Sequence, residues 1–319
     1  MLQEQETDFR EILSLFGVAF SSVRKDIPLV GSPERCGWRQ VLEAEDGCLW
    51  VLEQLKEGQD AWRERVAQVL AALAENQCPA VVSYEKVGEK FVLHHSSSSW
   101  QLQPYVSGEA LPRPEYIEDA ARGEAVAEFL AGFRTHAAGL AAPDQSEPFS
   151  LNAYVQELSE TLARGRQDVY APLVPVLRQL LEWEELFDSA PKALCHGDFH
   201  PLNVIWCKGR VEAVVDWEFM GFKPELYDLA NCLGCVGSED PRALVRGLCR
   251  ACVLSLRDKG VITKQNEHTL VPLLLGLRMA WLSEWLRRHD TEMLEMEVQY
   301  MNIILQNRAA LERIWGINA

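Results

Sequence analysis

The chain has 319 residues, 48% of them hydrophobic, and 47 acidic against 31 basic side chains give it a formal net charge of −16. This length suits two lobes that share a cleft better than one compact domain. The negative charge argues against non-specific binding to nucleic acid or to anionic membrane surfaces, which both need clustered Lys and Arg. No apolar run approaches the ~20 residues of a membrane span, and the N-terminus lacks the pattern of a signal peptide. We therefore expect a cytoplasmic protein with reduced cysteines.

The first hundred residues predict a small sheet that is interrupted by one helix. Short apolar runs between turn residues predict strands over four segments: 48–52, 80–84, 91–95 and 100–106. Between the first two, apolar residues share one helical stripe over 61–75, and Asp60 is placed to cap that helix. An earlier helix is expected from Thr7 to Phe20.

Beyond Gly108 the pattern changes to long helices. Besides one centred on Phe129 and Phe133, helices are expected over five segments: 151–165, 173–188, 241–258, 268–288 and 291–314. One β-rich segment, 192–216, lies among them. Strands followed by helices predict an α+β fold with two lobes, which we divide into residues 1–103 and 104–319.

The β-rich segment also concentrates residues with catalytic chemistry. Lys208-Gly209 predicts a tight turn between two apolar strands. A hairpin centred there places Asn203 opposite Val214 and puts Asp216 on the same face, two residues further along. Oxygen ligands from Asn203 and Asp216 suit a hard divalent cation. Asp198, on the preceding loop, could accept a proton from an attacking hydroxyl.

His196-Gly-Asp-Phe-His-Pro-Leu-Asn203 resembles the H-G-D-x-H-x-x-N catalytic loop of the aminoglycoside phosphotransferase and choline kinase-like family, whose fold is that of protein kinases. Val215-Asp-Trp-Glu218 is similar to that family's counterpart of the D-F-G motif, and Tyr227-Asp-Leu-Ala230 to the sequence that follows it. The three elements occur in the family's order and spacing. A weaker resemblance extends over nearly the whole chain. Trp100–Gly108 is similar to the hinge, and Phe133–His136 to the helix before the catalytic loop.

The resemblance implies a bilobal kinase that transfers the γ-phosphate of ATP to a hydroxyl of a small molecule, with Mg²⁺. It implies that Asp198 is the catalytic residue that orients or deprotonates the hydroxyl, and that Asn203 and Asp216 bind the Mg²⁺. It implies structural support from His196, which packs the loop, and from Asp228, which accepts hydrogen bonds from the loop backbone. The adenine edge would be read by the backbone of the hinge residues Gln103, Pro104, Tyr105 and Val106.

The motifs leave the acceptor open, because aminoglycosides, choline, homoserine, sugars and protein Ser/Thr all have kinases with this loop. The chain contains ten tryptophans, and Trp281 and Trp285 are one helical turn apart. In an acidic chain these residues favour an aromatic, carboxylate-lined pocket for a cationic acceptor, although tryptophans at this spacing are more often core residues.

The chain departs from the family where a strand should end in the Lys that binds the phosphates, because Trp50-Val-Leu-Glu53 ends in a carboxylate there. We place Glu53 in the nucleotide site and hold three interpretations. Arg39, Arg63 or Arg65 replaces the Lys in an active kinase, and Glu53 pairs with Arg63 or Arg65 in the reverse sense. Alternatively the protein is a pseudokinase with a binding or regulatory role. Finally, the strand register could be shifted. The preceding segment, 31–40, also lacks the G-x-G of a phosphate-covering loop.

An unrelated interpretation of the loop is a metal-dependent hydrolase, since His196, Asp198 and His200 alternate along the chain. A second His-bearing segment that would complete such a site is missing from the sequence. The kinase interpretation therefore explains more of the pattern.

Two C-x-x-C pairs raise the hypothesis of a zinc site: Cys232 with Cys235, and Cys249 with Cys252. Cys249 and Cys252 share a helical stripe with apolar residues such as Leu248. This pattern favours buried thiols that pack as small hydrophobic side chains.

Overall fold

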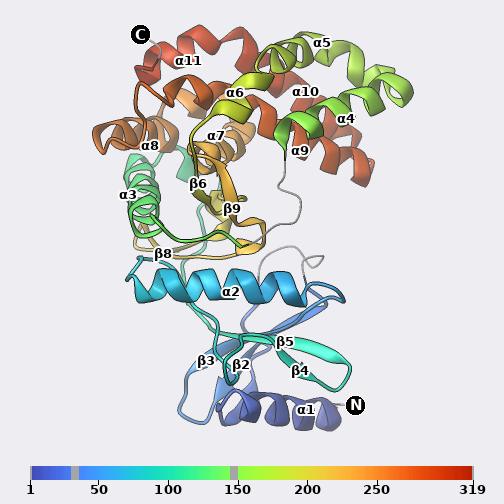
Figure 1. Cartoon of the computed structure of the whole chain (residues 1–319), viewed down its shortest axis with the longest axis vertical. Helices are drawn as coiled ribbons and strands as arrows, with labels where there is room; N and C mark the ends of the chain where they lie inside the picture. Colours follow the sequence, from blue (N-terminus) through green and yellow to red (C-terminus); the bar gives the residue numbers. More distant parts are fainter. Residues whose placement is uncertain (1, 30–35, 144–149, 318–319) are drawn as a thin grey trace.

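The computed structural model describes residues 2–29, 36–143 and 150–317. The chain forms two lobes, a smaller one built on a sheet and a larger one built mainly of helices (Figure 1). The smaller lobe contains α1 (Leu2–Leu15), β1 (Phe20–Val23), β2 (Trp38–Ala44), β3 (Leu49–Gln54), α2 (Asp60–Glu75), β4 (Leu93–His95) and β5 (Ser98–Pro104). Its five strands are antiparallel in the order β1-β2-β3-β5-β4. The expected two-lobed α+β fold is confirmed.

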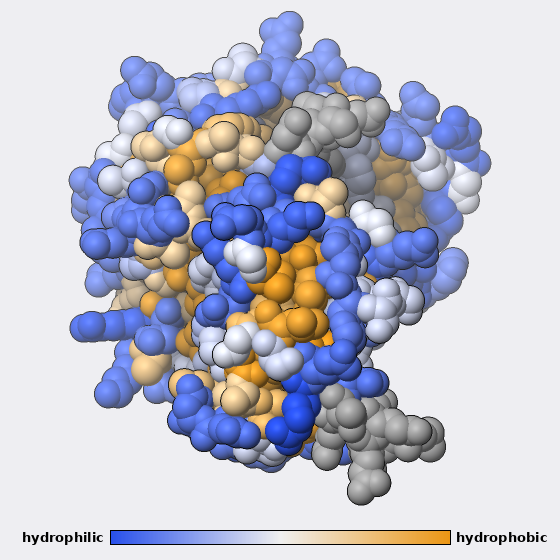
Figure 2. All heavy atoms as spheres, turned by 60° about the horizontal axis from the view of Figure 1, so that its bottom comes forward, coloured by the Kyte–Doolittle hydropathy of each residue, from blue (hydrophilic) through white to orange (hydrophobic). Residues whose placement is uncertain are grey.

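Side-chain alternation gives this sheet two different faces. On one face Leu42, Leu52 and Leu102 are fully buried and join Ile12 and Leu13 of α1 in a small hydrophobic cluster. Apolar side chains also reach the surface where this lobe is turned toward the viewer (Figure 2). The opposite face carries polar residues at positions where β3 pairs with β5, and helix α2 covers it.

Helix α2 joins the two lobes through its apolar stripe. Val66, Leu70 and Leu73 belong to the large hydrophobic cluster of the helical lobe, and not to the cluster on the other side of the sheet. Figure 1 shows α2 lying between the sheet and the helical lobe. Its polar side chains are therefore placed where the two lobes meet.

The larger lobe combines two pairs of short strands, β6 with β9 and β7 with β8, with helices. Its helices are α3 (Ala120–His136), α4 (Leu151–Gly165), α5 (Gln167–Glu182), α6 (Glu184–Ser189), α7 (Tyr227–Glu239), α8 (Gly247–Asp258), α9 (Leu270–Arg288), α10 (Thr291–Gln306) and α11 (Arg308–Trp315). Its strands are β6 (Lys192–Cys195), β7 (Val204–Cys207), β8 (Arg210–Val214) and β9 (Gly221–Pro224). Within the described part of the chain, every helix is too short or too polar to cross a membrane.

The hairpin β7–β8 has the predicted turn but a different register at its open end. Lys208 and Gly209 both have positive φ, as a two-residue hairpin turn requires. A bulge between Ile205 and Trp206 shifts the pairing, so that Val204 and not Asn203 lies opposite Val214. Asn203 pairs instead with Val215, whose N–H donates to the Asn203 carbonyl at 3.0 Å.

Several other boundaries differ from the sequence expectation. The first helix spans Leu2–Leu15 instead of the expected Thr7 to Phe20. It cannot extend to Phe20, because Phe20 begins strand β1. Asp60 does not cap α2: the N-cap is Gln59, and the Asp60 carboxylate accepts from Ser99 Oγ at 2.8 Å. The segment 80–84 forms no strand and makes only one bridge, between Val81 and Val214. Residues 31–35 of the segment 31–40, which lacks a G-x-G, lie outside the described residues.

Candidate active site

The buried carboxylate of Asp228 binds the backbone of the loop between β6 and β7. Asp228, in the first turn of α7, accepts the backbone N–H of His196 at 2.7 Å and that of Gly197 at 2.9 Å. Burial raises the pKa of Asp228, and the hydrogen bonds from the backbone N–H groups of Gly197 and His196 oppose this rise. Gly197 has φ +88°, and a Cβ there would fall on the carbonyl oxygen of Phe219. The loop path therefore requires both Asp228 and a glycine.

His196 is fully buried and links this loop to the segment after β8. Its Nδ1 accepts the N–H of Asp198 at 3.1 Å, and its Nε2 lies 2.9 Å from the carbonyl oxygen of Val215. Because a backbone N–H needs an acceptor and a carbonyl needs a donor, these contacts assign the neutral form with its proton on Nε2. The ring also packs against Phe199 and Trp217.

Asp198 and Asn203 form a hydrogen-bonded pair at the top of the loop. Asn203 Nδ2 donates to the Asp198 carbonyl at 2.8 Å and to its Oδ2 at 3.3 Å. On the other side Asn231 of α7 donates to Asp198 Oδ1 at 3.5 Å and to the Phe199 carbonyl at 3.2 Å. Two amides therefore orient one carboxylate.

Asp216 is placed beside this pair by the backbone. It follows Val215, which is hydrogen-bonded to Asn203, and it adopts the left-handed conformation with φ 65° and ψ 51°. Asp tolerates this conformation better than most side chains do. The following segment is tied to the smaller lobe, because Trp62 of α2 donates its indole N–H to the Glu218 carbonyl at 2.7 Å.

Glu53 and Arg63 form a buried ion pair between β3 and α2. Arg63 Nη2 donates to Glu53 Oε2, and only 6% of Glu53 and 8% of Arg63 are exposed. Arg63 Nε donates to Gln101 Oε1 at 2.9 Å, and Nη2 also reaches Tyr84 Oη at 3.2 Å. The predicted contact of Glu53 with a helix Arg is confirmed. Arg65 instead packs over the Trp62 ring.

Besides Glu53, which contacts it, two further carboxylates influence the pKa of the Arg63 guanidinium. Burial favours a lower pKa for Arg63, but Tyr84, Glu53, Glu218 and Asp216 outweigh it and raise the pKa. Burial also raises the pKa of Tyr84. Arg63 lowers this pKa, whereas Glu53, Asp216 and Glu218 raise it further. Arg63 thus lies in the field of both Glu53, on the sheet, and Asp216, after the hairpin.

Residues 43–257, which include all of these positions, match the model of the phosphotransferase enzyme family. The chain belongs to this family. Comparison with curated proteins gave no match.

Solved structures of phosphotransferases share the fold of this chain. The amicoumacin kinase hAmiN, in complex with AMP-PNP, Ca²⁺ and Ami, is 12% identical with a TM-score of 0.66, covering 95% of this chain and 96% of that one. The aminoglycoside phosphotransferase APH(4)-Ia is 17% identical with a TM-score of 0.65, covering 96% and 99%. The macrolide 2′-phosphotransferase MphH from Brachybacterium faecium is 15% identical with a TM-score of 0.58, covering 94% and 98%. At these identities the likeness establishes the protein kinase-like fold of this phosphotransferase.

In the hinge, fewer backbone N–H groups are available to bind a ligand than the sequence suggested. Gln103 and Pro104 belong to β5, Pro104 has no N–H, and Tyr105 N–H donates to the Leu49 carbonyl at 2.8 Å. Among the four hinge residues this leaves Val106 N–H as the donor that no described residue occupies. Beyond it, Glu109 N–H donates to the Trp206 carbonyl at 2.7 Å and ties the hinge to the hairpin.

Aromatic side chains lie close to Asp198. His200 Nε2 is 3.8 Å from Asp198 Oδ2, and its ring meets half-buried Trp281 edge-on at 6.3 Å. Trp281 also contacts Trp285 at 5.8 Å. The sequence suggested that carboxylates line this pocket. Next to Trp281, however, the buried carboxylate of Glu297 is paired with Arg278, whose guanidinium lies 5.4 Å from the Trp281 ring.

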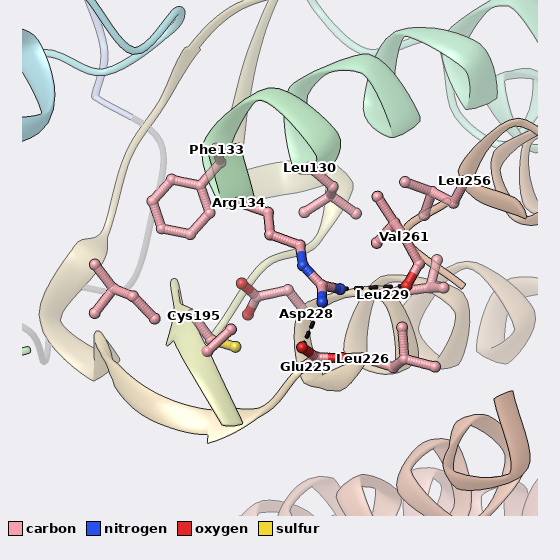
Figure 3. Close-up of a pocket in the computed structure, with 12 residues that line it drawn as sticks. Leu130, Phe133, Arg134, Cys195, Glu225, Leu226, Asp228, Leu229, Leu256 and Val261 are labelled. Atoms are coloured by element: carbon pink, nitrogen blue, oxygen red, sulfur yellow. Dashed lines mark hydrogen bonds and ion pairs between the residues drawn. The ribbon is translucent and has the colours of Figure 1, made fainter. Parts of the chain in front are cut away.

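A small cavity of about 30 Å³ lies next to Cys195 and Asp228, at the base of the loop between β6 and β7 (Figure 3). Asp228 and Cys195 line it, together with Arg134 of α3, which binds Glu225 and donates to the Val261 carbonyl at 3.2 Å. Asn266 donates to the other Glu225 oxygen at 2.8 Å. These contacts anchor the segment that leads into α7 and so hold Asp228 in place.

The four cysteines of the two C-x-x-C pairs do not form a metal site in the described part of the chain, where no three His, Cys, Asp or Glu side chains are placed to share a metal. Cys232, Cys249 and Cys252 are fully buried in the large hydrophobic cluster. Burial raises the pKa of Cys235 to about 12. The interpretation of Cys249 and Cys252 as buried thiols is confirmed.

Sequence reasoning missed several residues that surround the site. Gln101 and Tyr84 hold Arg63, and Asn231 holds Asp198. Pairing β3 with β5 could have identified Gln101, since it lies directly opposite Glu53. Asn231 could have been found from its position one helical turn after Asp228. Tyr84 has no such signal, because it lies outside any strand.

Proposed function

We propose that this phosphotransferase transfers the γ-phosphate of ATP to a hydroxyl of a small molecule, with Mg²⁺. The observation that carries this proposal is the hydrogen-bonded pair of Asp198 and Asn203, on a loop fixed by Asp228 and adjacent to Asp216. Phosphoryl transfer depends mainly on positioning and on charge stabilisation, which such a rigid loop supplies.

In this proposal Asp198 is the catalytic residue. Its carboxylate accepts a hydrogen bond from the acceptor hydroxyl and so turns a lone pair of the hydroxyl oxygen toward the γ-phosphorus. It takes the hydroxyl proton as the new P–O ester bond forms and the bond from the γ-phosphorus to the bridging oxygen breaks, which releases ADP. The amides of Asn203 and Asn231 keep the carboxylate in one rotamer. Neutral His196 and the Asp228 carboxylate act only on the loop backbone, as positioning residues.

Asn203 and Asp216 suit a divalent cation. Because Asn203 Nδ2 is used on Asp198, its Oδ1 remains as a hard oxygen ligand, and Asp216 offers a carboxylate. When bound, Mg²⁺ would neutralise charge on the nucleotide phosphates. The two lobes, divided as residues 1–103 and 104–319, would hold the nucleotide between them in the cytoplasm. Val106 N–H is the hinge donor that best suits the adenine edge.

The acceptor is proposed to be a small molecule that combines a hydroxyl with cationic or apolar groups. Trp281 lies near Asp198 through His200 and offers a half-buried aromatic surface, part of which the Arg278 guanidinium already covers. Leu202, Phe219 and Phe222, in or after the catalytic loop, are each at least half exposed. Amicoumacin and hygromycin B, which related solved structures contain, are small-molecule ligands of those kinases.

A pseudokinase is the second candidate function. It is favoured by the carboxylate of Glu53, which lies where a kinase of this kind has a Lys and which would repel phosphate. Under this alternative the protein binds a partner or ligand and transfers no phosphate.

A turnover assay separates the two functions. The wild-type protein is incubated with ATP, Mg²⁺ and a panel of hydroxyl compounds that includes aminoglycosides, amicoumacin, macrolides and choline, and phosphate esters are detected by mass. Asp198→Asn is the matched control, and we expect it to lower turnover about 10²–10⁴-fold while nucleotide affinity is retained. Equal turnover in wild type and variant would refute the role of Asp198.

A further inference from the structure

We propose that Arg63 supplies the positive charge that binds the nucleotide phosphates, through its terminal nitrogen Nη1. This inference rests on the proposed function and adds to it the residue that takes the place of the missing Lys. It assigns Glu53 a different role from phosphate contact, since Glu53 would hold Arg63 in position.

The hydrogen bonds of Arg63 leave one edge of the guanidinium unused. Nε donates to Gln101, and Nη2 donates to Glu53 and Tyr84. No described residue accepts from Nη1. Three fixed contacts therefore hold a planar, permanently charged group in one orientation and leave two N–H donors for a ligand. Arg binds phosphate well through such donors.

Arg63 lies close to the segment that carries the proposed metal ligand Asp216. Its helix lies between the sheet and the helical lobe, and its neighbour Trp62 is hydrogen-bonded to the Glu218 backbone, two residues after Asp216. The charge of Asp216 itself acts on Arg63. A phosphate chain bound to a cation on Asp216 would thus pass within reach of the guanidinium.

The Glu53–Arg63 pair consists of one carboxylate and one cation, as the pair of a kinase does, but the two have exchanged places between strand and helix. A kinase carries the cation on the strand and the carboxylate on the helix. Here the carboxylate is on β3 and the cation on α2. Glu53 lies behind Arg63 in this scheme and is neutralised by it, so that the repulsion expected between Glu53 and phosphate does not arise.

Affinity measurements on a charge-neutral double variant test this inference. Glu53→Gln/Arg63→Gln removes both charges, so that a loss of phosphate affinity cannot come from an unpaired Glu53. The binding of Mg²⁺–AMP-PNP and of adenosine is measured by calorimetry for wild type and variant. We expect the variant to bind Mg²⁺–AMP-PNP about 10–100-fold more weakly, because charged hydrogen bonds are lost, and adenosine equally well. Arg65→Gln, on the same helix, is the control and should bind as wild type does.

The outcomes separate this inference from the proposed function. If the double variant binds Mg²⁺–AMP-PNP as tightly as wild type does while Asp216→Asn abolishes binding, Arg63 only neutralises Glu53 and the inference is wrong. If Arg39→Gln weakens binding and the double variant does not, the cation is Arg39, which lies opposite Glu53 on β2. If the wild-type protein binds adenosine as tightly as it binds Mg²⁺–AMP-PNP, the phosphates and Mg²⁺ add no affinity and both proposals fail.

A second variant covers the case in which the double neutral protein unfolds. Glu53→Arg/Arg63→Glu restores the usual kinase polarity with side chains of similar size. We expect it to bind Mg²⁺–AMP-PNP at least about tenfold more tightly than Arg63→Glu alone does. Equal affinities of these two proteins would contradict the inference.

Discussion

The indole N–H of Trp62, in helix α2, donates to the backbone carbonyl of Glu218 at 2.7 Å, although 156 positions separate the two residues. This bond joins the helix that carries Arg63 to the segment that carries Asp216. The positions of the proposed cation and of the proposed metal ligand are therefore coupled across the two lobes.

Replacing Trp62 tests this coupling. We expect Trp62→Phe to lower the free energy of unfolding by about 0.5–1.5 kcal/mol more than Trp50→Phe does, because it removes a hydrogen bond. The Trp50 indole N–H is buried and has no acceptor among the described residues, so it is a matched control. Urea denaturation of both variants measures the difference. Equal losses would mean that the bond to Glu218 contributes nothing to stability.

The glycine of the catalytic loop can be tested against a glycine of the same conformation elsewhere. Gly197 has φ +88° and packs on the Phe219 carbonyl, whereas Gly209 has φ +73° and no atom within 4 Å of the place that a Cβ would take. Both Ala substitutions strain the backbone, but only Gly197→Ala also creates a clash. We expect Gly197→Ala to be the more destabilising by about 1–3 kcal/mol, as measured by thermal unfolding. A Gly209→Ala effect of the same size would show that the close approach is unimportant.

The buried ion pair predicts a large effect of charge reversal at position 53. Glu53→Lys places a second cation against Arg63, and we expect it to lower the free energy of unfolding by about 3–5 kcal/mol. The exposed Glu57→Lys makes the same charge change and should stay within about 0.5 kcal/mol of wild type. Tighter nucleotide binding by Glu53→Lys, without loss of stability, would favour the pseudokinase alternative.

The buried Asp228 predicts the sign of a pH effect on stability. Because burial raises its pKa from 3.8, the folded state binds a proton at Asp228 more readily than the unfolded chain does. Its contribution to stability is therefore complete below pH 3.8 and decreases as pH rises through the raised pKa. The free energy of unfolding of wild type minus that of Asp228→Asn should fall with rising pH in this window. A difference that rises with pH would show that the two backbone amides outweigh burial.

Local pattern was enough to predict the elements whose form depends on nearby residues. The turn at Lys208 and Gly209, the apolar stripe of α2 and the burial of Cys249 and Cys252 all follow from side-chain size and spacing. The catalytic loop was identified because its motif is contiguous in the sequence, and the Glu53–Arg63 contact because strand register and helix position could both be inferred.

Features that depend on distant packing could not be predicted. The bulge at Ile205 and Trp206 moves Asn203 opposite Val215, and a simple count from the turn cannot reveal it. The contact of Tyr84 with Arg63 depends on the path of an irregular segment over α2. The bond from Tyr105 N–H to the Leu49 carbonyl removes a hinge donor, and it depends on the pairing of two strands that are about fifty residues apart in the sequence.

The central claim, that the protein binds a metal–nucleotide complex through Asp216 and Asn203, is tested most directly by calorimetric titration of the wild-type protein with ATP in the presence and absence of Mg²⁺. We expect binding that depends on Mg²⁺ and that Asp216→Asn removes, while the thermal stability of the variant stays close to that of wild type. Wild-type protein that binds no ATP with Mg²⁺ present, or that binds it equally well without Mg²⁺, would contradict the claim.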